Sequence, residues 1–549
     1  MIYFDLLVDI PSKKRVQKPS GCVYEILQRK GKNSDKDVIK CVGRISPVPN
    51  KIYPNDAYFE LHPDCSQEHL LEPSFINSNI SIGNFLLLNN IARKSFLYDT
   101  LYQHFNEHTD LILAISYYSL FNRSSVMQNF DNFVFFNYCG LNYCPSESKI
   151  SKLFNNVMTK EKIDAFLNDW LSFKLKHLSK SNNTINIDFD STNFNISSKA
   201  FNFAEYGKAK IDEGLPQINV AFFIDRNTGT PLYYDVYYGS IIDMEHFKCA
   251  IEKIRSISDS VNACFVMDRG YFSRSNLNFS KQNGCSYLCM GKHTKTFEQL
   301  IKSFPIRDIT STKNYVDGDC YGVKVYDKAF VEDEENSYLY LFYDSSRITR
   351  ELKYLIKENR YISDVIIGKN DSNMLIRNTY KKFLDIRVDE EGFIVEVNIK
   401  YDELDRYRDS MGYFWMVSNE DMAVEDVYKT YRQRDLVEKE FTMAKSGCDM
   451  VKKYAQSEEA YMAKSLISFI CTIIRADIIN TMKPYFHQYP SETTQTVIME
   501  MSKVVAQKIR DKYVLRYALT NRQKQILSHY YMDKRNVINL INEINILDL

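Results

Sequence analysis

The chain has 549 residues, a length that predicts about two to four domains. It carries 70 Lys and Arg against 70 Asp and Glu, so the net charge is zero and a polybasic coat over the whole surface is excluded. With 44% apolar and 14% aromatic residues the chain can bury large cores, and its 18 Gly and 13 Pro exclude collagen-like or linker-rich proteins.

The first ten residues lack a cationic segment followed by an apolar one, so we expect no secretory signal. The longest apolar stretch, 466–479, is interrupted by Arg475 and Asp477 and is shorter than the roughly 20 residues of a membrane span. We therefore expect a buried helix there and no membrane partner. The 12 cysteines are scattered without a Cys-x-x-Cys pair, which is typical of reduced thiols in a cytoplasmic protein.

Residues 1–75 are predicted to form a small, β-rich, basic region with short strands at 22–27 and 38–45. Residues 11–51 include eleven Lys and Arg but only three acidic residues, which gives this segment a local charge of +8. A solvated surface and a surface that contacts DNA phosphates both fit this charge. Residues 76–182 are predicted to be a helical region for DNA binding or assembly, because apolar residues recur at helical spacing over 82–105, 111–121 and 161–178.

The pattern changes to alternating strands and helices over 183–292. Three strands in a meander, followed by helix and strand in alternation, predict a mixed α/β sheet flanked by helices. The expected strands are 185–190, 218–224, 232–238, 263–267 and 285–290, and the expected helices are 243–257 and 273–282.

Short β-like runs separated by charged segments predict a β-rich insertion at 293–410, with strands at 321–326, 337–343 and 393–399. A strand at 412–417 and a long helix at 423–445 then form the second part of the core, 411–454. Residues 455–549 are predicted to be a helical C-terminal region.

Three carboxylates stand out by their positions. Asp190 ends the first strand of the predicted sheet, Asp268 follows the fourth, and Glu438 lies within the long helix. If the first and fourth strands are parallel neighbours, the two aspartates meet at one edge of the sheet. Three clustered carboxylates need a divalent cation, and oxygen ligands favour Mg²⁺ or Mn²⁺ over zinc. Taken singly, each could instead be a turn, cap or solvated residue.

The long helix carries further polar residues on the face that holds Glu438. At about 100° per residue, Tyr431, Arg434, Glu438 and Lys445 fall within an arc of about 60°. An acid for metal beside cations and a phenol for phosphate suits phosphodiester chemistry on DNA. The alternative is an exposed helix face, since Arg434 and Glu438 form an i,i+4 pair.

The spacing Tyr431-x2-Arg434-x3-Glu438-x6-Lys445 resembles the YREK signature of bacterial DDE transposases of the insertion-sequence-four type. The Asp-Ser-Thr sequence at 190–192 and the Val-Met-Asp-Arg-Gly-Tyr sequence at 266–271 resemble the motifs around the first and second aspartates of these enzymes. The signature is specific, whereas the two aspartate motifs alone would be weak.

The resemblance implies an RNase H-like fold interrupted by a β-rich insertion. It also implies that Asp190, Asp268 and Glu438 are the catalytic residues that bind two Mg²⁺ or Mn²⁺ ions. Two such metals can activate a water or a 3′-hydroxyl and stabilise the leaving oxygen. Asp188, two residues earlier on the same strand face, is the local alternative, and the Asp-x-Thr match favours Asp190.

By the same resemblance, Tyr431, Arg434 and Lys445 would contact double-stranded DNA near the cleaved end. Relatives act as dimers on paired ends, and several form a hairpin with a flipped base. Trp415 could stack on such a base, but its place in the strand 412–417 favours a core residue.

The first hypothesis is therefore a cut-and-paste DNA transposase, a homodimer on the terminal inverted repeats and target DNA, in the nucleoid of a bacterial cytoplasm. The alternatives are a catalytically inactive, domesticated DNA-binding protein and an RNase H-like nuclease that acts on other DNA. Nine Lys and Arg against two Asp give 503–535 a local charge of +7, so we expect basic ends around an acidic metal site.

Overall fold

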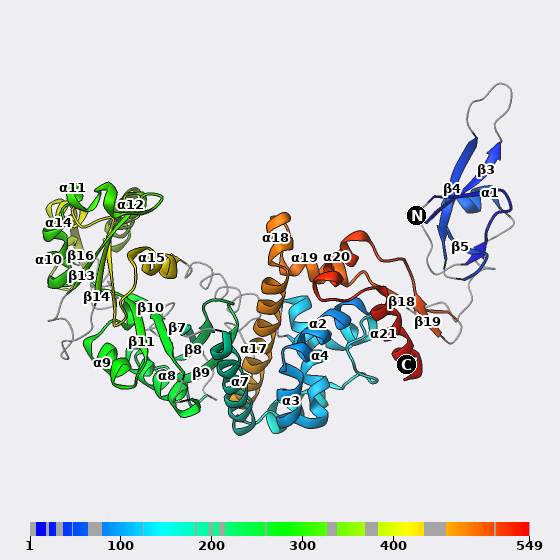
Figure 1. Cartoon of the computed structure of the whole chain (residues 1–549), viewed down its shortest axis with the longest axis horizontal. Helices are drawn as coiled ribbons and strands as arrows, with labels where there is room; N and C mark the ends of the chain where they lie inside the picture. The colour runs from blue at the N-terminus through cyan, green and yellow to red at the C-terminus, as the bar shows by residue number, and fades with distance from the viewer. Residues whose placement is uncertain are drawn as a thin grey trace. The chain divides into compact units, whose positions relative to one another are not determined.

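The computed structural model describes residues 7–17, 21–28, 37–46, 48–63, 79–123, 126–181, 184–196, 201–207, 215–258, 261–326, 338–367, 383–432, 457–509 and 512–547. The chain forms two compact units (Figure 1). Unit 1 comprises Met1–Trp170 with Phe441–Leu549, and unit 2 comprises Leu171–Glu440. The predicted mixed α/β class is confirmed, with helices and several sheets.

Unit 2 is built on a nine-stranded sheet in the order β12-β13-β14-β17-β11-β10-β7-β8-β9. Its first five strands along the chain are β7 (Ile185–Asn195), β8 (Gln217–Asp225), β9 (Pro231–Tyr238), β10 (Ala263–Met267) and β11 (Ser286–Met290). The strands β7, β8 and β9 form an antiparallel meander, and β10 runs parallel to both β7 and β11. All five strands were expected from the sequence, although β7 continues five residues beyond the predicted end.

Two helices connect the later strands of this group. The helix α8 (Asp243–Ile257) precedes β10, and α9 (Arg274–Gln282) precedes β11, and both lie on the same side of the strands in Figure 1. The Ser273 side chain accepts a hydrogen bond from the backbone N–H of Asn276 and so caps the start of α9. Both helices begin and end within a residue of the predicted positions.

The segment 293–410 contains the predicted strands but also helices that were not predicted. The strands β12 (Tyr315–Asp317), β13 (Cys320–Tyr326) and β14 (Tyr338–Asp344) continue the main sheet beyond β17 (Tyr413–Ser418). The strands β15 (Leu384–Val388) and β16 (Ile394–Ile399) form a separate pair. The α-helices among the described residues of this segment are α10 (Lys295–Ser303), α11 (Ile306–Ile309), α12 (Ser345–Ile366) and α14 (Tyr401–Arg408).

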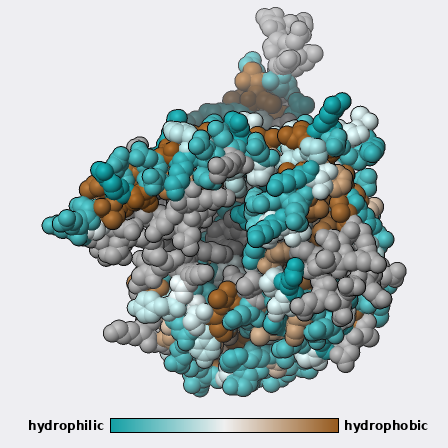
Figure 2. Space-filling model, turned by 90° about the vertical axis from the view of Figure 1, so that its left-hand side faces the viewer, coloured by the Kyte–Doolittle hydropathy of each residue, from teal (hydrophilic) through white to brown (hydrophobic). Residues whose placement is uncertain are grey.

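The outer surface at this end of unit 2 is mainly hydrophilic where Figure 2 colours it. Ile306 and Val395 are exposed apolar side chains, and single exposed residues of this kind are common on protein surfaces.

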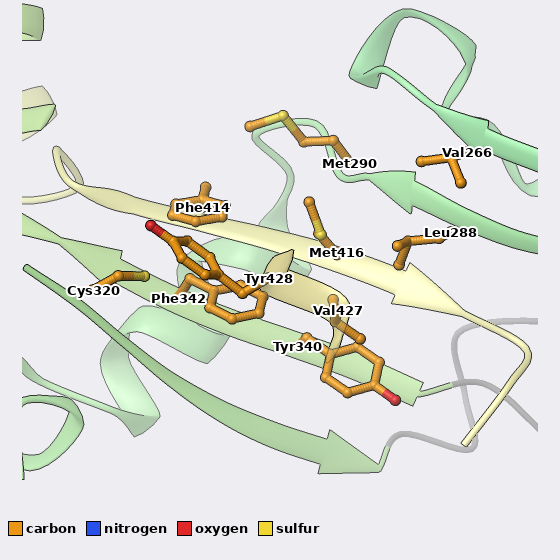
Figure 3. Close-up of a cluster of buried hydrophobic side chains, with 10 residues drawn as sticks. All are labelled: Val266, Leu288, Met290, Cys320, Tyr340, Phe342, Phe414, Met416, Val427 and Tyr428. Atoms are coloured by element: carbon orange, nitrogen blue, oxygen red, sulfur yellow. The ribbon is translucent and has the colours of Figure 1, made fainter. Parts of the chain in front are cut away.

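A cluster of buried side chains holds the helix α15 (Val424–Arg432) on the sheet (Figure 3). Val427 and Tyr428 of α15 are buried against residues of β14 and β17, and the rings of Phe342 and Phe414 stack with centroids 5.0 Å apart. Burying each large apolar side chain contributes about 1.5–3 kcal/mol. Packing of this kind fixes the helix that carries Tyr431.

Unit 1 is organised around the long helix α17 (Glu458–Thr481), which is buried along most of its length. It packs against α2 (Gly83–Lys94) and α4 (Thr109–Asn122). The stretch 466–479 is therefore a buried helix, as predicted. Within the described ranges, no helix is long and apolar enough to cross a membrane.

The expectation of continuous helical spacing over 82–105 is wrong at one point. The chain breaks between α2 and α3 (Leu97–Phe105) because Phe96 adopts a left-handed conformation with φ of 62°. Among the described residues, the further α-helices of this part are α5 (Phe130–Phe136), α6 (Glu147–Lys152) and α7 (Lys160–Ser181), the last of which continues into unit 2.

The prediction of a wholly helical region from 455 is wrong for residues 505–515. There β18 (Val505–Ile509) and β19 (Lys512–Leu515) form a hairpin that pairs with β6 (Asn79–Ser81). This partner lies more than 400 residues away in the sequence, so local periodicity could not indicate the sheet. The helices of the region besides α17 are α18 (Lys483–Gln488), α19 (Thr494–Met501), α20 (Asn521–His529) and α21 (Lys534–Ile546).

The N-terminal part of unit 1 is a five-stranded sheet in the order β1-β5-β4-β3-β2. Its strands are β1 (Val8–Asp9), β2 (Lys14–Gln17), β3 (Cys22–Gln28), β4 (Val38–Ile45) and β5 (Lys51–Pro54). The helix α1 (Asp56–Leu61) covers one face, where Tyr58 packs on Val23 and Ile52. The two strands expected from the sequence are β3 and β4.

Candidate active site

The two predicted aspartates lie on adjacent parallel strands. In the pairing of β10 with β7, Val266 is opposite Asp188. Two residues further along each strand the chain reaches Asp268 and Asp190, so both carboxylates stand at the same level of the sheet. Each residue is half-buried. The Asp268 side chain also accepts a hydrogen bond of 2.7 Å from the backbone N–H of Arg269, which fixes the turn after β10.

A buried hydrogen bond joins the two aspartate motifs. The hydroxyls of Ser191 and Tyr271 lie 2.6 Å apart; Ser191 directly follows Asp190, and Tyr271 comes three residues after Asp268. The ring of Tyr271 also packs edge-to-face on Phe189, with centroids 5.0 Å apart. These contacts fix the backbones on either side of Asp190 and Asp268 relative to each other.

Asp188, the alternative to Asp190, is committed to a buried ion pair with Arg226. The Arg226 Nη2 and Asp188 Oδ1 atoms are 2.9 Å apart, and the Nε–H donates to Oδ2 at 3.1 Å. The Arg226 side chain is fully buried, and 6% of the Asp188 side chain is exposed. Because its carboxylate neutralises a buried guanidinium, Asp188 is a poor candidate for a metal ligand.

Arg226 also connects this pair to α15. Its Nη1–H donates a hydrogen bond to the backbone carbonyl of Thr430 in the last turn of the helix. The guanidinium thus contacts a carbonyl near the end of the described part of α15, where a cation interacts favourably with the helix dipole. The Asp188–Arg226 pair therefore ties the end of α15 to the strand that carries Asp190.

Tyr431 lies near the edge that holds the aspartates. Its hydroxyl donates to the Met290 sulfur at 3.1 Å, at the end of β11, the strand next to β10. Its ring lies against Phe414, with centroids 6.1 Å apart. The Cys289 thiol, also on β11, contacts the Asp268 carbonyl at 3.7 Å. Tyr431 of α15 thus contacts the end of β11, and Asp268 follows the end of the neighbouring strand β10.

The other residues of the predicted site, Arg434, Glu438 and Lys445, lie outside the described residues. In the part of the chain that the structure describes, no three His, Cys, Asp or Glu side chains gather as metal ligands. The donor set of Asp190 and Asp268 consists of carboxylate oxygens at one sheet edge, which suits a hard divalent cation.

The chain matches the family described as "Transposase DDE domain" over residues 183–474, just over half of its length. It belongs to the transposase DDE domain family. The matched region includes Asp190 and Asp268 and extends through the YREK-like signature.

Among solved structures, the chain is similar to one described as "Cryo-EM structure of piggyBac transposase synaptic complex with hairpin DNA". The identity is 9% and the TM-score is 0.34, with 89% of this chain and 80% of that chain covered. No curated protein matches the chain.

Trp415 is a core residue of the transposase domain. It is 1% exposed, its Nε1–H donates to the Lys292 carbonyl at 2.9 Å, and its ring packs on Phe272 and Phe297. A Cβ on Gly291 would meet the Trp415 ring at 2.0 Å, so only glycine fits there. The base-stacking alternative is therefore excluded for this conformation.

The sequence analysis missed the structural role of two residues in the transposase domain. Tyr271 and Ser191 both lie in the two aspartate motifs, at 266–271 and 190–192, but the motifs did not indicate that their hydroxyls pair. Arg226 stands in the turn between β8 and β9, 38 residues from Asp188, and no spacing rule indicated their pairing.

Proposed function

We propose that the protein is an active DNA transposase of the insertion-sequence-four type that cuts and pastes a mobile element. The observation that supports this most directly is the parallel pairing of β7 with β10, which brings Asp190 and Asp268 to one level of the sheet. Membership of the transposase DDE family agrees with it.

The strand order of the core supports an RNase H-like arrangement. An antiparallel meander, β9-β8-β7, is followed by β10 and β11, each parallel to its inner neighbour. The sheet then continues through β17 into the strands of the insertion. In this proposal the insertion precedes the helix that carries Glu438.

Asp190, Asp268 and Glu438 would hold the divalent ions, two Mg²⁺ or Mn²⁺. When bound, these ions would supply activation of the attacking oxygen and neutralisation of the leaving one. The protein's own groups position the carboxylates: the Ser191–Tyr271 hydrogen bond fixes the two strand ends, and the Asp188–Arg226 pair fixes α15.

Tyr431, with Arg434 and Lys445, would hold the DNA near the cleaved phosphodiester, because a phenol and two cations on one helical face suit phosphate contacts. The partners are double-stranded DNA, as terminal inverted repeats and target, and a second copy of the chain assembled on the paired ends. The proposed location is the nucleoid in a bacterial cytoplasm.

Cleavage of a labelled transposon-end duplex in Mg²⁺ tests the proposal. Asp190→Ala, Asp268→Ala and Glu438→Ala should each abolish nicking while binding of the duplex persists. Asp235→Ala provides a matched control, since Asp235 is a half-exposed carboxylate of the same unit on β9. If the triad variants cleave normally, the site assignment is wrong.

Two other outcomes favour the alternatives. Wild-type protein that binds the end but never cuts it would indicate an inactive DNA-binding protein. Cleavage of any duplex without joining of the 3′-hydroxyl to a target plasmid would indicate a nuclease.

A further inference from the structure

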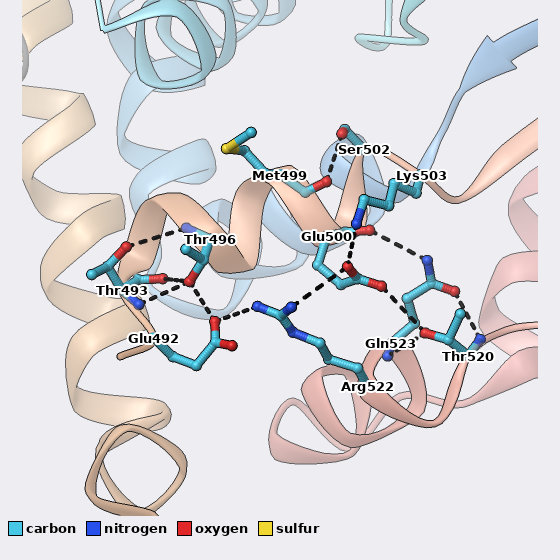
Figure 4. Close-up of polar contacts among 10 residues, drawn as sticks. All are labelled: Glu492, Thr493, Thr496, Met499, Glu500, Ser502, Lys503, Thr520, Arg522 and Gln523. Atoms are coloured by element: carbon cyan, nitrogen blue, oxygen red, sulfur yellow. Dashed lines mark hydrogen bonds and ion pairs between the residues drawn. The ribbon is translucent and has the colours of Figure 1, made fainter. Parts of the chain in front are cut away.

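The basic C-terminal segment is less available to a partner than its sequence suggests. Three of its cations are engaged by carboxylates within unit 1. Lys503 pairs with Glu500 at 2.7 Å, Arg535 pairs with Asp533 at 2.8 Å, and Arg522 pairs with both Glu492 and Glu500. Figure 4 shows Arg522 directed towards the carboxylates of Glu492 and Glu500, and Lys503 directed towards that of Glu500. Because Glu492 and Glu500 precede the segment 503–535, counting charges along that segment overstates its positive potential.

A different arrangement occurs where the hairpin β18–β19 meets the N-terminal sheet. Arg44 of β4 and Arg516, just after β19, both lie on the ring of Tyr517. Their guanidinium carbons are 5.5 Å and 5.3 Å from the ring centroid. We call these three residues the basic stack. It joins the two segments that carry the +8 and +7 local charges in the sequence.

The junction around the basic stack is a packed interface. Tyr53 of β5 is fully buried, and its hydroxyl donates to the Gln507 side chain of β18. The Tyr53 ring packs edge-to-face on Tyr517, with centroids 6.4 Å apart. Burial raises the pKa of both phenols, so these rings remain neutral platforms at physiological pH. The two cations are thus held in place by the fold.

The strand register adds a third cation to the same face. Arg44 is opposite Cys22 and Tyr53, while Arg15 of β2 is opposite Tyr24 of β3. Directly paired residues share a face, as do residues two apart on a strand. Arg15 therefore lies on the face of Arg44, away from α1, and its side chain is exposed. Neither Arg15 nor Arg44 has a carboxylate partner among the described residues.

Arginine is suited to this position. A guanidinium that stacks on an aromatic ring keeps its N–H groups directed along its plane, where they can bind phosphate oxygens. Two guanidinium groups on one ring repel each other, and an approaching polyanion relieves that repulsion. Half-buried side chains also lose less conformational entropy on binding than fully exposed ones.

We propose that the basic stack, with Arg15, is a composite anchor for the phosphate backbone of duplex DNA, built jointly by the N-terminal sheet and the C-terminal hairpin. The choice of DNA as the polyanion rests on the proposed function. The anchor binds without reading sequence, because its contacts are to phosphates.

The test is the salt dependence of DNA affinity, measured by fluorescence anisotropy of a labelled duplex with the full chain. Each phosphate contact contributes about 0.9 to the slope of log K against log salt. Arg44→Gln with Arg516→Gln should lower the slope by about 1.8 and weaken binding by roughly 60-fold near 0.1 M salt. The matched control, Lys160→Gln with Arg535→Gln, removes two cations from exposed ion pairs and should leave the slope unchanged.

A second double variant separates charge from packing. Arg44→Lys with Arg516→Lys keeps both charges but not the planar stack, and it should retain most of the slope. Equal loss in the Lys and Gln variants, together with a lowered melting temperature, would show that the stack only holds the sheet on the hairpin. A Gln variant with the wild-type slope would also overturn the proposal.

Nicking assays on the same samples keep this inference separate from the proposed function. If the wild-type protein never cleaves but the Gln variant loses slope, the transposase proposal fails and the anchor stands. If the protein cleaves and the slope is unchanged in the Gln variant, the anchor alone fails.

Discussion

Arginine is used in two opposite ways in the two units. In unit 2, the Arg226 side chain is fully buried between the Asp188 carboxylate and the Thr430 carbonyl. In unit 1, Arg44 and Arg516 are half-buried and lie on a tyrosine ring. A buried cation must be paired within the protein, so it can fix geometry but cannot bind DNA. Both arginines on this ring are only half-buried, and Arg44 has no carboxylate partner among the described residues, so its charge can serve as a contact.

The largest expected effect comes from breaking the buried pair. Asp188→Asn should destabilise unit 2 by about 3–5 kcal/mol, because the Arg226 charge would remain buried without its carboxylate. Urea unfolding followed by tryptophan fluorescence measures this. Trp170→Phe leaves Trp415 as the only tryptophan and so as the reporter for unit 2, since the chain has two tryptophans.

The matched variant is Asp188→Leu with Arg226→Met, which replaces the pair by apolar side chains. It should recover most of the stability but cleave poorly, because the Thr430 carbonyl loses its donor and α15 is no longer tied to β7. Normal cleavage by this stable double variant would show that the pair does not position the site.

The buried pair also shows what the sequence could and could not predict. Asp188 was recognised as an alternative to Asp190 because both lie on one strand face, and the strand itself is correct. Its actual partner depends on how the β8–β9 turn folds back, which is a tertiary property. Local periodicity predicted β10 and α8 to the residue, because a short buried strand and an amphipathic helix carry their own pattern.

Non-local features were missed for the same reason. The hairpin β18–β19 is completed by β6 from the other end of the chain, and its short strands carry little signal of their own. The basic stack likewise needs Arg44 and Tyr517, which the sequence separates by hundreds of residues. Charge counting indicated both basic segments but not which of their cations pair internally.

The second-largest effect is expected at alkaline pH, which should lower the unfolding free energy of unit 2 because its core holds neutral thiols and phenols. Burial raises the pKa of Cys264 from 9.0 to about 12, with the nearby Arg226 charge opposing the shift. The thiol stays protonated in the folded state and ionises on unfolding, so its contribution is complete below pH 9 and is lost as pH rises towards 12.

Cys264→Ala removes this dependence and tests the assignment. In urea titrations between pH 9 and 12, the variant should lose about 1.4 kcal/mol less per pH unit than the parent protein. Identical pH slopes for the two proteins would mean that Cys264 does not titrate on unfolding.

A smaller effect is expected at the hydrogen bond between the aspartate motifs. Tyr271→Phe leaves the buried Ser191 hydroxyl without its 2.6 Å partner and should cost about 1–2 kcal/mol. Nicking activity should fall by more than this loss of stability alone would cause, since the bond fixes the strand ends beside Asp190 and Asp268. Ser191→Ala with Tyr271→Phe removes both hydroxyls, so it should regain stability without regaining cleavage. A double variant that cleaves normally would assign the bond to stability alone.

The smallest effect is expected at Asp225, a second buried carboxylate on the strand beside β7. It is 0% exposed, and burial raises its pKa. Its Oδ2 accepts hydrogen bonds from the Thr228 N–H at 3.0 Å and from the Thr228 hydroxyl. An asparagine oxygen can accept the same bonds, so Asp225→Asn should change the unfolding free energy by less than about 1 kcal/mol.

The pH dependence of that variant sharpens the comparison with Asp188. A raised folded-state pKa means that Asp225 favours folding below its unfolded value of 3.8 and loses that contribution as pH rises. Any gain from Asp225→Asn should therefore appear at neutral pH and vanish in acid, as urea titrations at both pH values would reveal. If Asp225→Asn lowers the unfolding free energy as much as Asp188→Asn does, each of these buried carboxylates stabilises unit 2 through its own negative charge. If it does not, the large cost at Asp188 belongs to the guanidinium of Arg226.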